Sequence, residues 1–259
     1  MELTGIESLD RIMKQREMNI TSTLTNSSYK CNRCRDTGWI QSKRGYARCE
    51  CYEIDYINRL WENFGVNPND VKMLKDYKGY NQLTQKAKDK AVEYIKKFKE
   101  LEKEKWLCLM GQPGGGKTHI VLAVGGALLK QKIKVVYMPY LEATRELKSN
   151  AMDDEYYNKL SNRYKRAEVL IIDDLFKDKV KRGKISEEIT SADMKHIYPI
   201  INFRYTNKLP TLISTECTPN MLMNLDEALA GRILEMCGKK FGNVFDEECN
   251  YRLKEFKNS

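Results

Sequence analysis

The chain has 259 residues, a formal net charge of +9 from 45 Lys and Arg against 36 Asp and Glu, and eight cysteines. Its length suits one large domain or a small domain followed by a large one, and its basic surplus either favours a polyanion such as nucleic acid or serves solubility. Because the sequence contains no apolar run of membrane-spanning length and no signal-peptide pattern, we expect a cytoplasmic protein with no membrane partner, whose cysteines bind metal or pack in the core.

The first candidate site along the chain is a cluster of four cysteines. Cys31 and Cys34 form a C-x-x-C pair, and Cys49 and Cys51 follow after 14 intervening residues. This spacing is typical of tetrahedral Zn²⁺ sites, in which four thiolates close the coordination shell and leave the metal a structural role. An iron–sulfur cluster and free thiols are the alternatives.

Helical and strand patterns alternate in the rest of the chain. An amphipathic helix is predicted between residues 86 and 105, and we place a domain boundary before it, between a zinc-binding domain at 1–72 and a larger domain at 73–259. Strands are expected over 106–110, 133–138, 169–172 and 211–214, and helices over 117–130, 140–166 and 187–205. This alternation predicts an α/β fold in which helices flank a parallel sheet.

A glycine-rich segment, Gly111–Thr118, lies between the first of these strands and the following helix and matches the P-loop motif G-x-x-x-x-G-K-[ST]. In such a loop, backbone N–H groups at the helix N-terminus bind phosphates, the lysine reaches the β- and γ-phosphates, and the hydroxyl binds Mg²⁺. The expected ATP-binding residues are Gly111, Pro113, Gly114, Gly115, Gly116, Lys117, Thr118 and the backbone of His119.

The third predicted strand ends in two carboxylates, Asp173 and Asp174. At this place after a P-loop, Asp173 is expected to hold Mg²⁺ together with Thr118, and Asp174 to orient or deprotonate the attacking water. The basic segment Lys177–Lys184 that follows indicates a mobile, solvated loop, with contact to a DNA backbone as the alternative.

The P-loop, the acidic strand end and the upstream cysteines together resemble the bacterial and phage replicative helicase loaders of the DnaC/DnaI type, an AAA+ family. The run Cys31–Gly38 is similar to the zinc segment of the DnaI branch. The resemblance implies an AAA+ P-loop NTPase. Because most AAA+ proteins carry Glu where this chain has Asp174, one methylene shorter, either the attacking water sits closer or ATP hydrolysis is slow. The resemblance also implies that the N-terminal domain contacts a hexameric replicative helicase, while the AAA+ domains assemble side by side and bind single-stranded DNA.

Two further segments look like the helix and sensor strand of these loaders, Ile201–Tyr205 and Leu209–Thr215. The resemblance makes Arg204 a candidate for contacting nucleotide across a subunit interface. The family usually has Asn at the end of the sensor strand, where it senses the γ-phosphate. This chain has Ser-Thr-Glu there, so we expect Thr215 or Glu216 to take that role.

The segment Ala230–Ile233 resembles the box that supplies an arginine finger to the neighbouring subunit, which makes Arg232 a trans-acting candidate, with an ordinary salt-bridged helical arginine as the alternative. Residues 139–166 lie where loaders carry an extra helix along a single-strand DNA path. The basic and aromatic side chains there are Arg145, Lys148, Lys159, Arg163, Lys165, Arg166, Tyr156, Tyr157 and Tyr164. Basic side chains suit phosphates and tyrosines can stack on bases, although each residue by itself is typical of surface or core.

Two other functions compete with the helicase loader. One is the related ATPase subunit of a transposase, which the zinc cluster disfavours. The other is an adaptor that binds ATP but hardly hydrolyses it, which remains open because Asp174 replaces the usual Glu and the sensor position is altered.

Overall fold

In the computed structural model of this protein, the described residues are 29–42, 45–63, 73–181 and 183–251. The chain divides into two compact units, Met1–Tyr56 and Ile57–Ser259, and each is described by itself. The predicted domain boundary between residues 72 and 73 falls at the edge of a stretch outside the described residues, so it stays a prediction.

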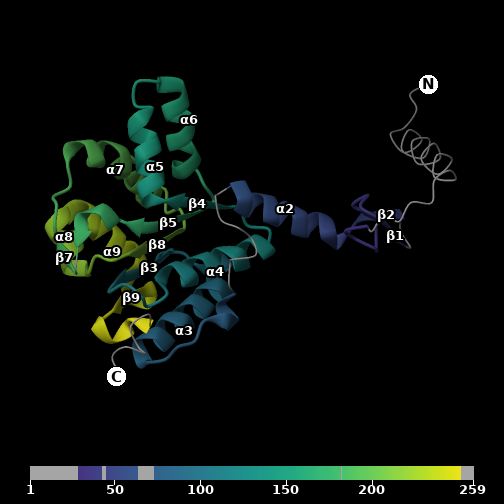
Figure 1. Cartoon of the computed structure of the whole chain (residues 1–259), viewed down its shortest axis with the longest axis horizontal. Helices are drawn as coiled ribbons and strands as arrows, with labels where there is room; N and C mark the ends of the chain where they lie inside the picture. The colour runs from purple at the N-terminus through teal and green to yellow at the C-terminus, as the bar shows by residue number, and fades with distance from the viewer. Residues whose placement is uncertain (1–28, 43–44, 64–72, 182, 252–259) are drawn as a thin grey trace. The chain divides into compact units, whose positions relative to one another are not determined.

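The first unit contains an antiparallel hairpin of β1 (Trp39–Ser42) and β2 (Gly45–Arg48), followed by the start of α2 (Glu50–Asn63) (Figure 1). The Arg48 guanidinium lies 4.0 Å from the centre of the Trp39 ring and 4.1 Å from that of Tyr52. Among the described residues of this unit, the buried hydrophobic side chains are Cys34 and Cys49. A unit with so small an apolar core depends on other stabilising contacts, and the thiol cluster is the evident source.

The second unit is built around a five-stranded parallel sheet with strand order β4-β5-β8-β3-β9. Its elements are η1 (Leu74–Asp76), α3 (Gln82–Lys97), η2 (Phe98–Glu100), β3 (Trp106–Gly111), α4 (Lys117–Lys130), β4 (Val135–Pro139), α5 (Tyr140–Ser149), α6 (Asp154–Lys165), β5 (Val169–Leu175), η3 (Lys177–Lys179), β6 (Val180–Lys181), β7 (Lys184–Ile185), α7 (Ser191–Thr206), β8 (Thr211–Thr215), α8 (Pro219–Leu225), α9 (Glu227–Phe241), β9 (Gly242–Phe245) and η4 (Glu247–Cys249). The predicted α/β class is confirmed, and β9 is a fifth strand that the sequence patterns did not predict.

Each face of this sheet has its own hydrophobic cluster, because successive side chains of a strand point to opposite faces. In β5, Val169 and Ile171 pack with the cluster that includes α3 and α4. Leu170 and Ile172 pack with the cluster that includes α5, α7 and α9. Helices therefore cover both faces (Figure 1), which leaves the carboxyl edge of the strands for the polar residues described below.

The bounds of two helices differ from the predicted ones because local N-terminal caps set where each helix begins. The single helical stretch predicted over 140–166 is two helices, since the Asp153 carboxylate accepts a hydrogen bond from the Tyr156 N–H and starts α6 anew. The helix α7 begins at Ser191 because Thr190 and Asp193 form a capping box. No helix among the described residues is long and apolar enough to cross a membrane.

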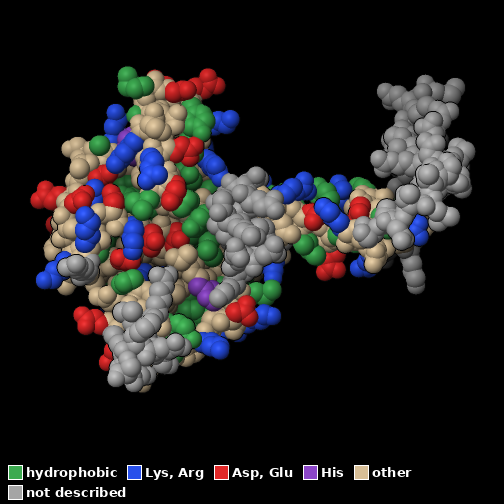
Figure 2. All heavy atoms as spheres, in the orientation of Figure 1, with side chains coloured by type: hydrophobic (Ala, Val, Ile, Leu, Met, Phe, Trp, Pro, Cys, Tyr) green, Lys and Arg blue, Asp and Glu red, His purple; other side chains and the backbone are tan. Residues whose placement is uncertain are grey.

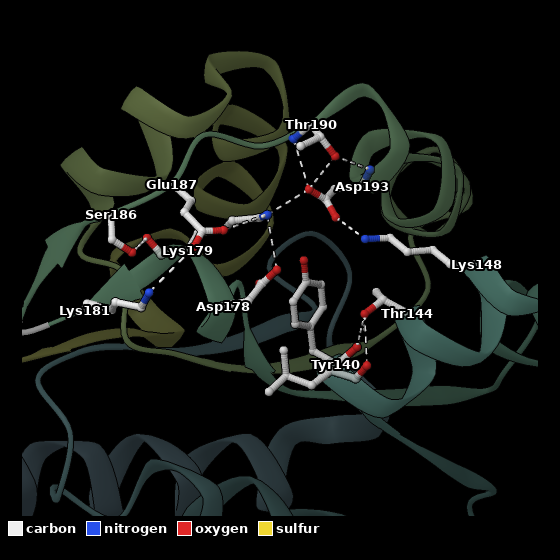
Figure 3. A network of polar contacts seen from close by, with 11 residues as sticks. Tyr140, Thr144, Lys148, Asp178, Lys179, Lys181, Ser186, Glu187, Thr190 and Asp193 are labelled. Atoms are coloured by element: carbon white, nitrogen blue, oxygen red, sulfur yellow. Dashed lines mark hydrogen bonds and ion pairs between the residues drawn. The ribbon is translucent and has the colours of Figure 1, made fainter.

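The segment after β5 is fixed by ion pairs around two buried side chains, Lys179 and Asp193. We call the group the Asp193 network: Lys148, Asp178, Lys179, Thr190 and Asp193 (Figure 3). Lys179 Nζ lies 2.9 Å from one Asp193 carboxylate oxygen and Lys148 Nζ lies 2.5 Å from the other. Asp193 is 2% exposed and Lys179 is 4% exposed. The prediction of a solvated loop over Lys177–Lys184 is therefore wrong for Lys179, because a partner distant in sequence draws its ammonium into the interior.

Candidate functional site

The P-loop connects β3 to α4 through backbone conformations that require glycine. Gly111 has φ +94° and Gly116 has φ +77°, both in the left-handed region that favours glycine. A Cβ on Gly111 would lie 2.3 Å from the Phe245 carbonyl oxygen, and one on Gly116 would lie 2.6 Å from the Tyr77 ring. The Tyr77 hydroxyl also donates to the Gly115 carbonyl, over 2.6 Å. The loop is therefore held in shape from both sides, as a backbone cradle for phosphates requires.

Lys117 opens α4 and lies inside the loop. Its ammonium donates to the carbonyls of Gly111 and Gln112, over 2.7 and 2.6 Å. Burial lowers the pKa of Lys117 to about 8, while the Glu216 and Asp174 carboxylates act to raise it. An ammonium that is short of compensating negative charge suits a phosphate ligand.

Thr118 and Asp173 present neighbouring oxygens, which is the arrangement an Mg²⁺ ion needs. The Thr118 hydroxyl donates to Asp173 Oδ1 over 2.9 Å. The Tyr137 hydroxyl donates to Asp173 Oδ2 over 2.9 Å, and the Ser214 hydroxyl also donates to Oδ1. Burial and the Asp173 charge raise the pKa of Tyr137, so the phenol stays protonated and remains a donor. These residues fit Mg²⁺ bound with a nucleotide phosphate.

Asp174 lies beside Asp173 in an uncommon backbone conformation, with φ +56°. Its N–H donates to the Ser214 hydroxyl over 2.9 Å, which fixes the turn at the end of β5. Burial raises the pKa of Asp174 above its ordinary value, and the adjacent Asp173 charge raises it further. A carboxylate whose pKa is raised is a stronger base and is better suited to accept a proton from water.

The end of β8 carries polar side chains with different partners. The Thr215 hydroxyl donates to the Leu175 carbonyl over 2.6 Å and accepts from the Cys217 N–H over 3.0 Å. Glu216, in contrast, forms an ion pair with Lys177. Of the two expected sensor residues, Thr215 therefore bonds only backbone groups, whereas Glu216 bonds the Lys177 ammonium.

A cavity of about 300 Å³ adjoins the P-loop. Its lining residues are Asp76, Tyr77, Lys78, Tyr80, Gly114, Gly115, Gly116, His119 and Tyr251. The His119 ring packs edge-on against Tyr77, with ring centroids 5.4 Å apart, and the Tyr251 N–H donates to the Gly114 carbonyl over 3.2 Å. A cavity with aromatic walls next to a phosphate loop suits a nucleotide base.

The two arginines predicted to act on a neighbouring subunit lie in different environments. Arg204 is fully buried and donates to the Thr211 hydroxyl over 2.9 Å and to backbone carbonyls that include Ala167, over 2.8 Å. In this conformation the Arg204 guanidinium donates its hydrogen bonds to groups inside the fold. Arg232 is half-buried on α9, where it donates to Asn202 Oδ1 over 3.0 Å and to the Ala228 carbonyl over 2.7 Å. The hydrogen-bond partners of both arginines lie outside the P-loop, and both trans-acting roles stay predictions.

The four predicted zinc ligands lie together in the first unit. Their Sγ atoms are all within 4.8 Å of one another. Cys31 and Cys49 Sγ are 3.8 Å apart, and Cys34 and Cys51 Sγ are 3.3 Å apart. Tetrahedral Zn²⁺ with Zn–S bonds of about 2.3 Å places its sulfurs about 3.8 Å apart, so this donor set fits zinc. The Asp36 carboxylate accepts from the Cys31 N–H over 2.8 Å and shapes the first C-x-x-C turn.

A model of the family described as IstB-like ATP binding protein matches residues 63–235. The chain belongs to this family. The match covers the P-loop, Asp173, Asp174, Glu216 and Arg232, and ends before β9.

Relatives of this IstB-like chain include three proteins of Bacillus subtilis. "Uncharacterized protein YqaM" is 36% identical over 73% of this chain and 60% of its own length. "Phage-like element PBSX protein XkdC" is 31% identical over 82% and 80%, and "Replicative helicase loader DnaI" is 28% identical over 55% and 46%. The matched part of this chain thus covers less than two thirds of the length of YqaM and of DnaI.

The fold of this IstB-like chain is also that of a solved structure of DnaI. The two superpose with a TM-score of 0.54 at 21% identity, over 71% of this chain and 93% of the DnaI chain. This likeness shows the fold, and the family match together with the relatives above confirms the predicted relationship to the DnaC/DnaI-type proteins.

Proposed function

We propose that the protein is an ATP-dependent loader that places a hexameric replicative helicase on single-stranded DNA. The observation that carries this proposal is the occurrence in one chain of an IstB-like ATP-binding fold and an upstream four-thiol cluster. The proposal of a helicase as partner is supported by the relative named as a replicative helicase loader. In this scheme residues 1–72 form the zinc-binding part that grips the helicase, and residues 73–259 form the ATPase.

In the proposed mechanism, the chain's own groups bind the nucleotide and position the water. The P-loop N–H groups and Lys117 hold the phosphates, and Thr118 and Asp173 hold Mg²⁺, which neutralises phosphate charge when bound. Asp174, with its raised pKa, accepts a proton from the attacking water. Because Asp is one methylene shorter than the usual Glu, we expect slow hydrolysis that acts as a release switch and is stimulated by partner or DNA.

Single-stranded DNA is proposed to bind along α5 and α6, where Figure 2 shows Lys and Arg side chains among acidic ones. The exposed cations there are Arg145, Lys148, Lys159, Arg163 and Arg166. Of the three tyrosines considered for stacking, Tyr164 is buried and Tyr157 bonds His196 Nδ1 over 3.0 Å. Tyr156 is 42% exposed, and its hydroxyl donates to Glu146 Oε1 over 2.6 Å, so we propose that its exposed ring stacks on a base.

The proposal is tested by mixing the full chain with the replicative helicase of its host and following the complex by size exclusion with ATP and with ADP. We expect a complex whose amount depends on nucleotide, a Lys117→Ala variant that binds the helicase without that dependence, and a Cys49→Ser variant that binds it poorly. Glu248→Gln, at an exposed position, is the matched control. If no complex forms under any condition, the loader proposal fails.

The ATPase subunit of a transposase is the second candidate, because the family match itself is to IstB-like proteins. A transposase partner that binds the chain in place of the helicase would favour it. An adaptor with little hydrolysis is the third candidate, favoured by Asp174 and by Glu216 at the sensor position. Turnover that stays near zero with helicase and single-stranded DNA both present would favour this adaptor.

A further inference from the structure

The ion pair between Lys177 and Glu216 lies at the edge of the sheet where nucleotide chemistry is expected. Glu216 directly follows β8, and Lys177 opens η3, just after β5. The Lys177 side chain is 37% exposed and that of Glu216 is 13% exposed. The carboxylate is therefore mostly buried, and the lysine is partly accessible to solvent.

Three neighbouring strands bring this pair next to the P-loop. The strand β8 lies between β3 and β5 in the sheet. The Gly111 N–H, at the start of the P-loop, donates to the Cys217 carbonyl over 3.0 Å, and Thr215 is in register with Leu175. The residue between Thr215 and Cys217 is Glu216, so its backbone lies directly beside the loop. The Glu216 carboxylate is also the leading charge that counteracts the lowering of the Lys117 pKa by burial.

Without a cation beside it, the Glu216 carboxylate would repel a γ-phosphate bound at the P-loop. Like charges held close together in a low-dielectric site disfavour each other. The helicase loaders that the sequence resembles usually have a neutral Asn at the end of this strand. Ser214 and Thr215 do not supply a free donor, because their hydroxyl groups donate to Asp173 and to the Leu175 carbonyl. A cation paired with Glu216 cancels the repulsion and brings hydrogen-bond donors.

We propose that the Lys177 ammonium, oriented by Glu216, is the γ-phosphate sensor of this chain, the group that distinguishes ATP from ADP. The proposal rests on the ATP site of the proposed function and deepens it. The ion pair divides the task that one asparagine performs elsewhere: Glu216 fixes the direction of Lys177, and Lys177 supplies charge and donors to the terminal phosphate.

Lys177 is well placed for such a role because its backbone is held rigidly. Phe176, just before it, is fully buried at φ +60° and packs edge-on against Tyr140, with ring centroids 5.5 Å apart. A non-glycine residue persists in that conformation only where its surroundings impose it. The Asp193 network holds Lys179 on the other side. Both ends of the turn are anchored, so little ordering remains when Lys177 meets its ligand.

The test is the ratio of affinities for a non-hydrolysable ATP analogue and for ADP, measured by displacement of a fluorescent nucleotide from the full chain with Mg²⁺ present. Lys177→Met is expected to weaken binding of the ATP analogue by about tenfold, or about 1.4 kcal/mol, and to leave ADP affinity unchanged. Lys177→Arg should keep most of the preference. The double variant Lys177→Met/Glu216→Gln should regain part of the lost affinity, because the unpaired carboxylate is gone.

Lys181→Met is the matched control, since Lys181 belongs to the same segment and its side chain is 71% exposed. We expect it to bind both nucleotides like the wild type. Equal losses for the ATP analogue and ADP in Lys177→Met would overturn the proposal in favour of a structural ion pair, and so would unchanged affinities. Failure of the double variant to recover would refute the role assigned to charge pairing. Wild-type protein that binds no nucleotide would instead refute the ATP site itself, so the two failures are distinguishable.

Discussion

Replacing Asp193 with Asn should destabilise the second unit strongly. The carboxylate accepts from the ammonium groups of Lys148 and Lys179 and from the Thr190 N–H and hydroxyl. The amide keeps the shape but removes the charge, and Lys179, at 4% exposure, loses its closest anion. Removing one partner of a buried ion pair costs about 3–5 kcal/mol. At about 2–4 °C per kcal/mol for a unit of this size, the melting temperature should fall by about 6–20 °C.

Thermal and urea unfolding of Asp193→Asn, followed by circular dichroism, measure this loss. Glu187→Gln is the control, because it makes the same carboxylate-to-amide change on a side chain that is 54% exposed, and its effect should stay within about 0.5 kcal/mol. Burial opposes ionisation of Asp193, but bonds from Lys148, Lys179 and Thr190 hold its pKa far below the usual range. Its contribution is therefore complete above the unfolded pKa of about 3.9 and declines in more acidic solution. A loss below about 1 kcal/mol would refute the reasoning, since exposed pairs contribute that little.

Three other outcomes follow from the two sites. ATP affinity should decline as the pH rises above about 8, where Lys117 loses its proton, and a fluorescence titration across alkaline pH measures this; a flat profile would contradict it. Tyr137→Phe, which loses a bond to Asp173, should weaken Mg²⁺-dependent ATP binding by about tenfold, with no change when Mg²⁺ is chelated. The purified chain should contain about one zinc ion by atomic absorption and Cys49→Ser far less, because four thiolates form one tetrahedral shell; equal zinc contents would count against the site.

The sequence predicts the centre of the fold well because the signals there are local. Neighbouring residues are enough to indicate the strands that begin at Trp106 and Val169 and the turn of the P-loop glycines. The strand β9 escapes prediction because it is short and follows directly on α9. The burial of Lys179 escapes it too, since its partner Asp193 is distant in sequence and only the folded chain brings the two together.

Within the candidate site, residues that belong to a motif were predicted and those that depend on strand order were not. Thr118 and Asp173 meet as the motif implies. Tyr137 and Ser214 were missed, because their bonds to Asp173 follow from the positions of β4 and β8 on either side of β5. Knowledge that β8 adjoins β5 would have pointed to Ser214, the polar residue one position before the end of β8.

The strand order also has a consequence for how the chain folds. Gly111 ends β3, Asp173 lies near the end of β5, and Glu216 directly follows β8. These three strands are far apart in sequence, and in the sheet β8 lies between β3 and β5. Non-local pairings of this kind form late and slowly, because the entropy of closing a long loop is lost before the stabilising contacts form. The nucleotide pocket should therefore be among the last features to appear during refolding. Since ATP then binds only the finished sheet, the nucleotide acts as a ligand for the native state and stabilises the whole unit by mass action.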